Sequence, residues 1–375
     1  MNAQLVKPGE ACGPLAPATG RWVGRYLARG ERIARVVPLR GGWTSEMRRL
    51  DVVGPQGRRS LVLRQFVKPF FVRHAEGLLG REAEVLRLLG PTGVPAAEPV
   101  AVDPAGEHCA YPSLLMSLLP GAVRLDDEGA GARAPLLARQ LAVIHRVAVA
   151  EAGKPRVYQA WTSPERVTPP AGTERPGLWA RAVDVIRGEA PAYRGCFLHR
   201  DFHPGNVLFS GGGAPDGERG RAPDGERGGA PDGGRGGAAA AGDGAARSGD
   251  AARSGAREAA AGDGALRVSG VVDWVETSWG PADLDVAHCS TALALLHGVP
   301  AGMAFADLYA AAGGILAEDP AAHLYWRLVD ALAYAPDAEK VAVPWRELGR
   351  TDLTPAVLAG RLEAYVQALL DRYGC

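Results

Sequence analysis

The chain has 375 residues, of which 47% are hydrophobic and 22% are charged, so it can bury a sizeable core divided between two modest lobes. Lysine and arginine total 42, and aspartate and glutamate also total 42. This balance excludes a strong net field that would attract nucleic acid or an anionic membrane, and we expect neither as a partner. Nothing in the composition indicates an obligate protein partner.

The first twenty residues contain Pro and Gly where a signal peptide needs an unbroken apolar stretch, and no apolar run is long enough to span a bilayer. We therefore predict a cytoplasmic protein with a flexible N-terminus over residues 1–20. The cysteines are odd in number and lack CxxC spacing, which argues against a disulfide framework and a zinc site. We interpret them as reduced thiols: Cys12, Cys109, Cys196, Cys289 and Cys375.

The first elements predict a small antiparallel sheet with one helix, which together form an N-terminal lobe over residues 21–119. The helix lies between Gly80 and Gly90, where apolar residues recur at helical spacing with charges opposite. Pro120 and Gly121 then break the chain. The expected strands are rich in β-branched and other apolar residues and cover 35–39, 49–53, 60–66, 97–102 and 111–119.

The second half predicts a larger, mainly helical lobe over residues 120–375. Apolar residues recur there at three- and four-residue spacing in several segments. The expected helices cover 135–149, 284–296, 325–334 and 356–373. One short strand pair lies within this lobe, with NVLF as its first arm and LRVSGVVDW as its second.

Residues 211–264 separate the two arms and contain almost only Gly, Ala, Asp, Arg, Pro, Glu and Ser, with APDGERG repeated. Such a segment lacks the apolar side chains that offset ordering entropy, so we predict a disordered insertion. A loop that grows at a hairpin tip leaves the arms in register, because its closure cost rises only logarithmically with length. The simpler interpretation is a surface loop without a function of its own, and a docking segment is the alternative.

The most informative motif is FLHRDFHPGNVLF over residues 197–209, followed downstream by VVDW. It places Asp201 five positions before Asn206 in a loop between apolar segments, and VVDW adds Asp273. An attacking hydroxyl needs an acceptor for its proton, and a triphosphate needs Mg²⁺ held by oxygen ligands. One aspartate with an asparagine and a second aspartate is therefore typical of a phosphoryl-transfer site.

With HRDFHPGN, VVDW and the following GPADLD, the chain resembles the aminoglycoside phosphotransferase family of protein-kinase-like small-molecule kinases. The resemblance implies an α+β, bilobal protein-kinase-like fold and an ATP- or GTP-dependent, Mg²⁺-dependent transfer to a hydroxyl. It implies that Asp201 accepts or orients that hydroxyl, while Asn206 and Asp273 hold Mg²⁺. Protein kinases usually carry Lys two positions after the aspartate, whereas this chain has His203, as in the small-molecule branch.

In the first lobe the resemblance implies a cation on the third strand and an acid on the following helix. Arg64 and Glu82 stand at these places, although Arg departs from the kinase Lys, and Glu84 competes for the pairing. The alternative without a functional role is that Arg64 is a solvated arginine at the strand edge. The turn over the phosphates would contain Gly41, Gly42 and Ser45.

The adenine site implied by the resemblance lies at the lobe junction. Met116 and Leu118 belong to the strand whose edge would pair with the base, and Leu208 would form the floor; each is otherwise a core residue. We expect three residues to support the catalytic loop by hydrogen bonding. For His203, a contact with phosphate is the alternative role. These supporting residues are His199, His203 and Asp285, and His145 is interpreted as a core residue on its helix.

Two other functions fit parts of the sequence. His199, Asp201 and His203 form an HxDxH pattern that could bind a metal in a hydrolase, although this leaves Asn206 and VVDW unexplained. A catalytically silent nucleotide-binding scaffold is the second, motivated by Arg64 and the insertion.

The acceptor stays open on the sequence alone. A polycationic acceptor would need a carboxylate-rich cleft, and an apolar acceptor would need exposed rings, although aromatics at helical spacing more often pack helices. The candidate acids are Asp330, Asp337 and Glu339, interleaved with Arg327 and Lys340, and the candidate rings are Tyr325, Trp326, Tyr334 and Trp345.

Overall fold

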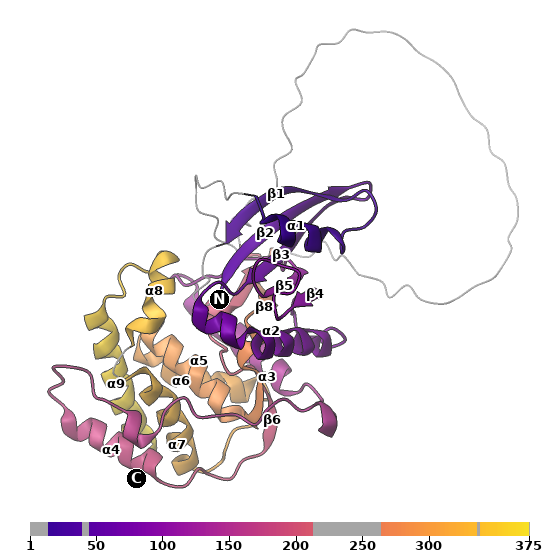
Figure 1. The fold of residues 1–375 in the computed structure, drawn as a ribbon. Helices are drawn as coiled ribbons and strands as arrows, with labels where there is room; N and C mark the ends of the chain where they lie inside the picture. The colour runs from indigo at the N-terminus through magenta and orange to yellow at the C-terminus, as the bar shows by residue number, and fades with distance from the viewer. Residues whose placement is uncertain (1–13, 40–44, 213–263, 336–337, 375) are drawn as a thin grey trace, which may run out of the picture.

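The computed structural model describes residues 14–39, 45–212, 264–335 and 338–374 (Figure 1). Gly41, Gly42 and nearly all of the predicted insertion 211–264 lie outside these residues, as do residues 1–13 of the predicted flexible N-terminus and Asp337. The rest of that N-terminal segment enters helix α1 (Pro17–Gly24), in which Thr19 is buried. Residues 17–20 are therefore helical, which corrects the expectation of a flexible segment up to residue 20.

The N-terminal lobe is a five-stranded antiparallel sheet in the order β1-β2-β3-β5-β4. Neighbouring side chains of a strand point to opposite faces, and both faces of the central strands are apolar. Val62 faces helix α2, whereas Leu61 and Leu63 face Trp22 of α1, so a helix covers each face. The strands are β1 (Arg32–Leu39), β2 (Glu46–Gly54), β3 (Gly57–Gln65), β4 (Pro99–Asp103) and β5 (Ser113–Ser117).

Helix α2 (Pro69–Leu89) begins well before the predicted start near Gly80. Pro69 occupies the first turn, where a missing N–H costs nothing, and Lys68 before it is extended. Gly77 and Gly80 have no atom within 4 Å of the space that a Cβ would fill, so they lie inside the helix without a packing requirement. The buried face of α2 carries Glu82 toward the sheet.

The connection between the lobes runs along the hairpin of the second lobe. Ala122 pairs with Phe209, and Ser269 Oγ donates a hydrogen bond to the Pro120 carbonyl at 2.8 Å. Gly121 between them has φ 92°, and a Cβ there would lie 2.6 Å from the Phe209 carbonyl oxygen. Only glycine fits this crossing.

The C-terminal lobe is mainly helical, and α5 lies at its centre, with residues 282–296 all buried. Figure 1 shows the helices gathered below the sheet. The α-helices are α3 (Ala130–His145), α4 (Pro176–Arg187), α5 (Ala282–His297), α6 (Val299–Ala311), α7 (Pro320–Ala331), α8 (Glu339–Glu347) and α9 (Pro355–Tyr373). Short 3₁₀ turns are η1 (Glu151–Gly153), η2 (Pro164–Arg166), η3 (Pro204–Asn206), η4 (Trp274–Glu276) and η5 (Leu332–Tyr334).

Two short antiparallel pairs frame the functional loops. β6 (Gly195–Leu198) pairs with β9 (Ser278–Pro281), and β7 (Val207–Ser210) pairs with β8 (Arg267–Val271). The second pair is the predicted hairpin, whose arms pair as far as Ser210 opposite Arg267, with one register shift between Leu208 and Phe209. Residues 199–206 join β6 to β7 and residues 272–277 join β8 to β9, so both loops lie between the same two strand pairs.

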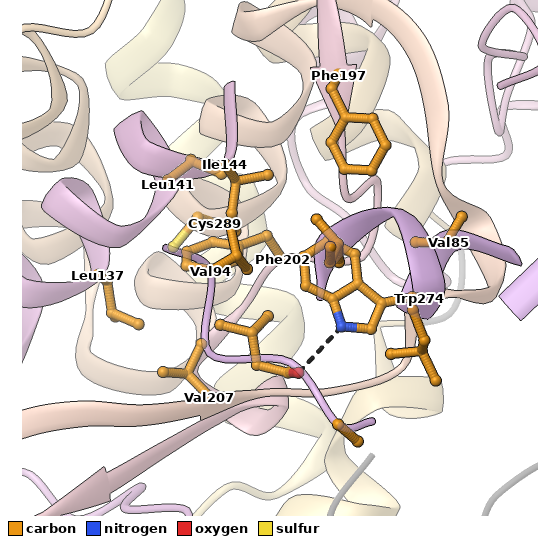
Figure 2. Close-up of a cluster of buried hydrophobic side chains, with 14 of the residues drawn as sticks. Val85, Val94, Leu137, Leu141, Ile144, Phe197, Phe202, Val207, Trp274 and Cys289 are labelled. Atoms are coloured by element: carbon orange, nitrogen blue, oxygen red, sulfur yellow. Dashed lines mark hydrogen bonds between the residues drawn. The ribbon is translucent and has the colours of Figure 1, made fainter. Parts of the chain in front are cut away.

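A shared apolar core lies beneath these loops (Figure 2). Phe197, Phe202 and Val207 from the first loop region pack with Trp274 from the second, and Val85 of α2 joins them. Trp274 Nε1 donates to the Val271 carbonyl at 3.0 Å, which satisfies its one buried polar atom. The predicted architecture, with a small antiparallel sheet and a larger helical lobe, is thus confirmed.

Among the described helices, none combines the length and the apolar character that a membrane crossing requires.

Candidate active site

Asp201 lies in the loop between β6 and η3 and is tied to Asn206. The Asn206 Nδ2 atom donates to the main-chain oxygen of Asp201 at 2.8 Å and to its Oδ2 atom at 2.9 Å. His203 stands 3.7 Å from Asp201 Oδ1 through Nε2, and its Nδ1 accepts the N–H of Gly205 at 3.0 Å. The five-residue spacing that the sequence shows therefore closes a compact loop around one carboxylate.

Asp285, on the first turn of α5, holds the start of this loop. Its two carboxylate oxygens accept the N–H groups of His199 at 2.7 Å and Arg200 at 2.8 Å. Arg200 has φ 71°, a left-handed conformation that a non-glycine residue adopts only when its surroundings impose it. His145 Nε2 lies 3.1 Å from Asp285 and His145 Nδ1 lies 2.7 Å from the Tyr309 hydroxyl. The His145 side chain is thus buried and hydrogen-bonded to Asp285, the residue that holds the loop.

His199 connects the two loops. Its Nδ1 accepts the N–H of Asp201 at 3.2 Å, its Nε2 lies 3.1 Å from the Val272 carbonyl oxygen, and its ring lies 4.4 Å from the Trp274 ring. Both nitrogens therefore face the backbone. The HxDxH hydrolase interpretation needs this side chain as a metal ligand beside Asp201 and His203, and the structure does not bring it there.

Asp273 lies next to Asn206 although more than sixty residues separate them. The Val272 N–H donates to the Asn206 carbonyl at 3.0 Å, which extends the β7–β8 pairing into both loops. Asp273 has φ 68° and directs its carboxylate to the lobe junction, where Arg64 Nη1 lies 3.1 Å away. Burial would raise the pKa of Asp273, but Arg64 outweighs it and lowers the pKa to about 2.

Arg64 of β3 contacts Glu82 of α2 through Nη1, at 2.7 Å and 2.9 Å from the two carboxylate oxygens. Glu84 is exposed, so the helix phase favours Glu82 over its competitor. The guanidinium is 6% exposed and stands 5.3 Å from the ring of Phe66. Arg64 is therefore a buried cation between two acids rather than a solvated arginine.

A pocket lies between the sheet and the second loop. Met116 and Leu208 line it, together with Arg64, Glu82 and Asp273. Its further lining residues are Met47, Val62, Leu86, Ser117, Leu119, Val272 and Trp274.

Two residues expected at this site do not line the pocket. Leu118 stands between Ser117 and Leu119, both of which do, and its N–H lies 3.4 Å from the Ser60 carbonyl. The expectation for Leu118 concerned the backbone edge of its strand, which the pocket lining does not test, so it stays a prediction. Ser45 is buried at the start of β2 and is also absent from the lining.

The sequence analysis missed His288 of α5. Its Nε2 lies 3.1 Å from Asp201 Oδ1, and its Nδ1 lies 3.0 Å from Asp330 of α7 and 3.3 Å from the Tyr334 hydroxyl. A histidine three positions after Asp285, about one helical turn along the same buried helix, is the signal that could have found it. Among the described residues, Asp201, His203 and His288 also form a group whose ligand atoms all lie within 4.8 Å.

The ionisation of this group follows from its neighbours. Burial alone would lower the pKa of His288, but Asp330 and Asp201 outweigh it and raise the pKa to about 9. Burial lowers the pKa of His203 to about 4, so this ring is neutral at pH 7. Burial would raise the pKa of Asp201, but His203 and His288 hold it well below its usual range. At pH 7 His203 is neutral, so of these two rings only His288 carries a charge beside Asp201.

The side chains considered for acceptor recognition are largely engaged elsewhere. Asp330 is buried against His288, and Glu339 pairs with Arg346. Trp326, Tyr334 and Trp345 are buried core residues, whereas Tyr325 is half-buried. In the described part of the chain these acids therefore do not gather into a carboxylate-rich cleft.

The residues at the loop junction suit a hard divalent cation. Asn206 offers a carboxamide oxygen and Asp273 an ionised carboxylate, and Mg²⁺ prefers oxygen ligands of both kinds. Arg64, whose charge already meets Asp273, stands beside the same carboxylate. Asn206 and Asp273 would therefore suit a divalent cation such as Mg²⁺.

The sequence was compared with models of protein families and with known proteins. The model of the phosphotransferase enzyme family matches residues 35–217. No curated protein matches the sequence. The fold is similar to that of aminoglycoside phosphotransferase APH(4)-Ia, with a TM-score of 0.52 and 15% identity over 96% of this chain and 99% of that chain.

Two further solved structures give the same result. A Ralstonia eutropha protein provisionally described as an aminoglycoside phosphotransferase has a TM-score of 0.51 and 16% identity over 94% of this chain and 98% of that chain. A thermostable mutant of APH(4)-Ia in ternary complex with AMP-PNP and hygromycin B has a TM-score of 0.52 and 15% identity, over 94% and 99% of the chains. The chain therefore has the fold of the aminoglycoside phosphotransferases and matches the phosphotransferase enzyme family over residues 35–217, which confirms the resemblance that the sequence predicts.

Proposed function

We propose that this protein transfers the γ-phosphate of ATP or GTP to a hydroxyl group of a small molecule. The observation that supports it most is the backbone bond between Val272 and Asn206, because it joins the Asp201–Asn206 loop to Asp273. An acceptor for the hydroxyl proton thus lies beside two oxygen ligands for a cation. The solved relative bound to AMP-PNP and hygromycin B supports a nucleotide and a small-molecule acceptor as the two substrates.

In this proposal the nucleotide occupies the pocket at the lobe junction. Met116 and Leu208 contact the base, and Arg64, fixed by Glu82, neutralises the phosphates. That Gly41, Gly42 and Ser45 lie over the phosphates stays a prediction from the sequence, and Leu118 contributes through its backbone at most. Residues 21–119 then form the nucleotide lobe, and residues 120–375 form the catalytic and acceptor lobe.

Magnesium, when bound, neutralises the developing phosphate charge and aligns the γ-phosphate. Asn206 and Asp273 would hold it. Asp201 orients the acceptor hydroxyl and takes its proton as the new oxygen–phosphorus bond forms. Asp285 and His199 keep the loop in the shape that this requires, through the backbone bonds of residues 199–201. Positioning and electrostatics supply most of the rate in such a site.

The proposal is tested with Asp201→Ala and Asp273→Ala in the full chain. We expect Asp273→Ala to abolish turnover of Mg-ATP, because a metal ligand is lost. Asp201→Ala should keep nucleotide binding but lose roughly 10²- to 10⁴-fold in rate, the usual effect of one acid–base group. Asp184→Ala, on the exposed face of α4, is the matched control and should keep full activity.

The acceptor is sought with a panel of amino sugars, macrolides, sugars and amino alcohols. The readout is an ATP-dependent mass gain of one phosphate, repeated with GTP. Unimpaired turnover in either active-site variant would refute the assigned roles. Thermal stabilisation by Mg-ATP without any phosphorylated product would instead support a silent nucleotide-binding scaffold.

A further inference from the structure

His288 lies between two carboxylates at the edge of the candidate active site. Its Nε2 is 3.1 Å from Asp201 Oδ1, and its Nδ1 is 3.0 Å from Asp330 Oδ1. The His288 side chain is 3% exposed and that of Asp330 is 1% exposed. The three groups come from the catalytic loop, from α5 and from α7, so tertiary packing alone assembles them.

The hydrogen-bond partners of His288 indicate the protonation state of its ring. An ionised carboxylate only accepts hydrogen bonds, whereas a neutral imidazole has one donor nitrogen and one acceptor nitrogen. With a carboxylate at each nitrogen, a neutral His288 would set its acceptor lone pair against a carboxylate oxygen. An imidazolium donates to both, and its charge compensates the buried Asp330, which is 1% exposed, and the partly exposed Asp201, at 29%. The raised pKa of His288, about 9, agrees with this geometry.

The other surroundings of His288 are rings and few charges. The Trp161 ring centroid lies 4.8 Å away, edge to face, and the Tyr334 ring stacks at 6.0 Å. The Tyr334 hydroxyl is 3.3 Å from Nδ1, and the neutral ring of His203 lies 5.8 Å away. The cation of Arg200 lies on Trp161 rather than on His288.

We propose that His288 and Asp330 are positioning residues that fix the carboxylate of Asp201 for the acceptor hydroxyl. The inference rests on the proposed phosphotransferase function. His288 donates to Oδ1 and Asn206 donates to Oδ2, so the carboxylate is held from both sides in one rotamer. Asp330 in turn holds the His288 ring. A rotamer shift of Asp201 would move the hydroxyl away from the γ-phosphorus.

The charge of His288 also sets when the proton moves. A cation at 3.1 Å makes Asp201 a weak base, so Asp201 orients the hydroxyl at first. The proton passes to Asp201 only as the oxygen–phosphorus bond forms and the bond from the γ-phosphorus to the nucleoside diphosphate breaks. Such late proton transfer suits a loose phosphoryl-transfer transition state.

The first test needs no acceptor and uses ¹⁵N-labelled full-length protein. Long-range ¹H–¹⁵N spectra report whether both ring nitrogens of a histidine carry protons, and His288→Gln assigns the signal. We expect a His288 imidazolium at pH 7.5 that loses its proton near pH 9, and a lower pKa in Asp330→Asn. A neutral His288 ring at pH 7.5 would overturn the inference and leave the proposed function untouched.

The second test measures turnover with an acceptor that the wild type phosphorylates. His288→Gln and Asp330→Asn should lower kcat about 10- to 100-fold, the size of effect that a small misplacement causes, with the affinity for Mg-ATP unchanged. The wild-type rate should fall as pH rises through about 9. This decrease at high pH should be absent in His288→Gln. The matched control is His297→Gln, at the other end of α5, where the histidine also pairs with an aspartate, Asp127.

Wild-type turnover and an unchanged decrease at high pH in His288→Gln would overturn the positioning role. An equal loss in the His297→Gln control would also overturn it, because the effect would then belong to the helix. If the wild type phosphorylates no acceptor while His288 is an imidazolium, the proposed function fails and the ion pair stands. The two failures are therefore distinguishable.

Discussion

Two buried clusters with the same charge order stand on either side of the loop that carries Asp201. On the nucleotide side Arg64 lies between Glu82 and Asp273, at 2.7 Å and 3.1 Å. On the other side His288 lies between Asp330 and Asp201, at 3.0 Å and 3.1 Å. Each cluster thus links one aspartate of the candidate active site to a supporting acid through a cation.

The clusters differ in whether the cation can lose its charge. Arginine stays protonated at every working pH, so the Asp273 cluster is permanent. Histidine can titrate, and the pKa of His288 lies near 9. A permanent cation suits phosphates that are always anionic. A titratable one suits the role proposed for Asp201, which would accept a proton and release it again in each cycle.

The largest expected effect comes from breaking the permanent cluster. Arg64→Leu leaves two buried acids without their shared cation, and it should cost about 3–5 kcal/mol of unfolding free energy. Urea unfolding at pH 7.5 measures it. Arg48→Leu, on the neighbouring strand, removes a partly exposed pair with Glu46 and should cost less than about 1 kcal/mol. Equal costs for both variants would remove the distinction between buried and surface pairs.

A smaller effect comes from titrating the second cluster. The pKa of His288 is raised from its ordinary 6.5 to about 9, so its stabilisation is complete below about pH 6.5 and is lost as pH rises through 9. The loss amounts to about 3 kcal/mol. Urea unfolding of the wild type and His288→Gln at pH 6 and pH 9.5 measures it. The stability difference between the two proteins should shrink at the higher pH; a constant difference contradicts the raised pKa.

The smallest effect tests the second contact of His288 Nδ1. Tyr334→Phe removes the hydroxyl at 3.3 Å while keeping the ring that stacks on His288. We expect a loss of about 1 kcal/mol or less, because Asp330 remains the main partner. Tyr325→Phe, on a half-buried position of α7, is the control and should have no effect. A loss as large as that of Asp330→Asn would mean that the hydroxyl, and not the carboxylate, holds the ring.

Much of the fold could be predicted because its signals are local. The strands with apolar alternation, and the hairpin arms on either side of the low-complexity segment, lie where the sequence indicated. The start of α2 was missed because the sequence interpretation placed the helix between Gly80 and Gly90, whereas α2 already begins at Pro69. Helices α4, α6 and α8 were not predicted, because their apolar spacing is short or interrupted by proline and glycine.

The residues of the candidate site also fall into those that local motifs could predict and those that they could not. Asp201, Asn206 and Asp273 could be read from motifs, since their spacing is set by one loop and one hairpin. His288 and Asp330 could not, because they meet Asp201 only through the packing of α5 and α7. The sequence offered Asp330 as a candidate for acceptor recognition, whereas in the fold it is buried behind His288.

The hairpin of β7 and β8 has a practical consequence. Its arms pair up to Ser210 and Arg267, and the Gly212 N–H meets the Gly264 carbonyl beyond them, so the two described flanks end side by side. Asp201 and Asn206 stand on one flank and Asp273 on the other. A chain divided within 213–263 therefore separates the proposed metal ligands into two polypeptides. Co-expressed fragments that reassemble would recover phosphate transfer only on reunion, which suits this protein to a split-enzyme reporter.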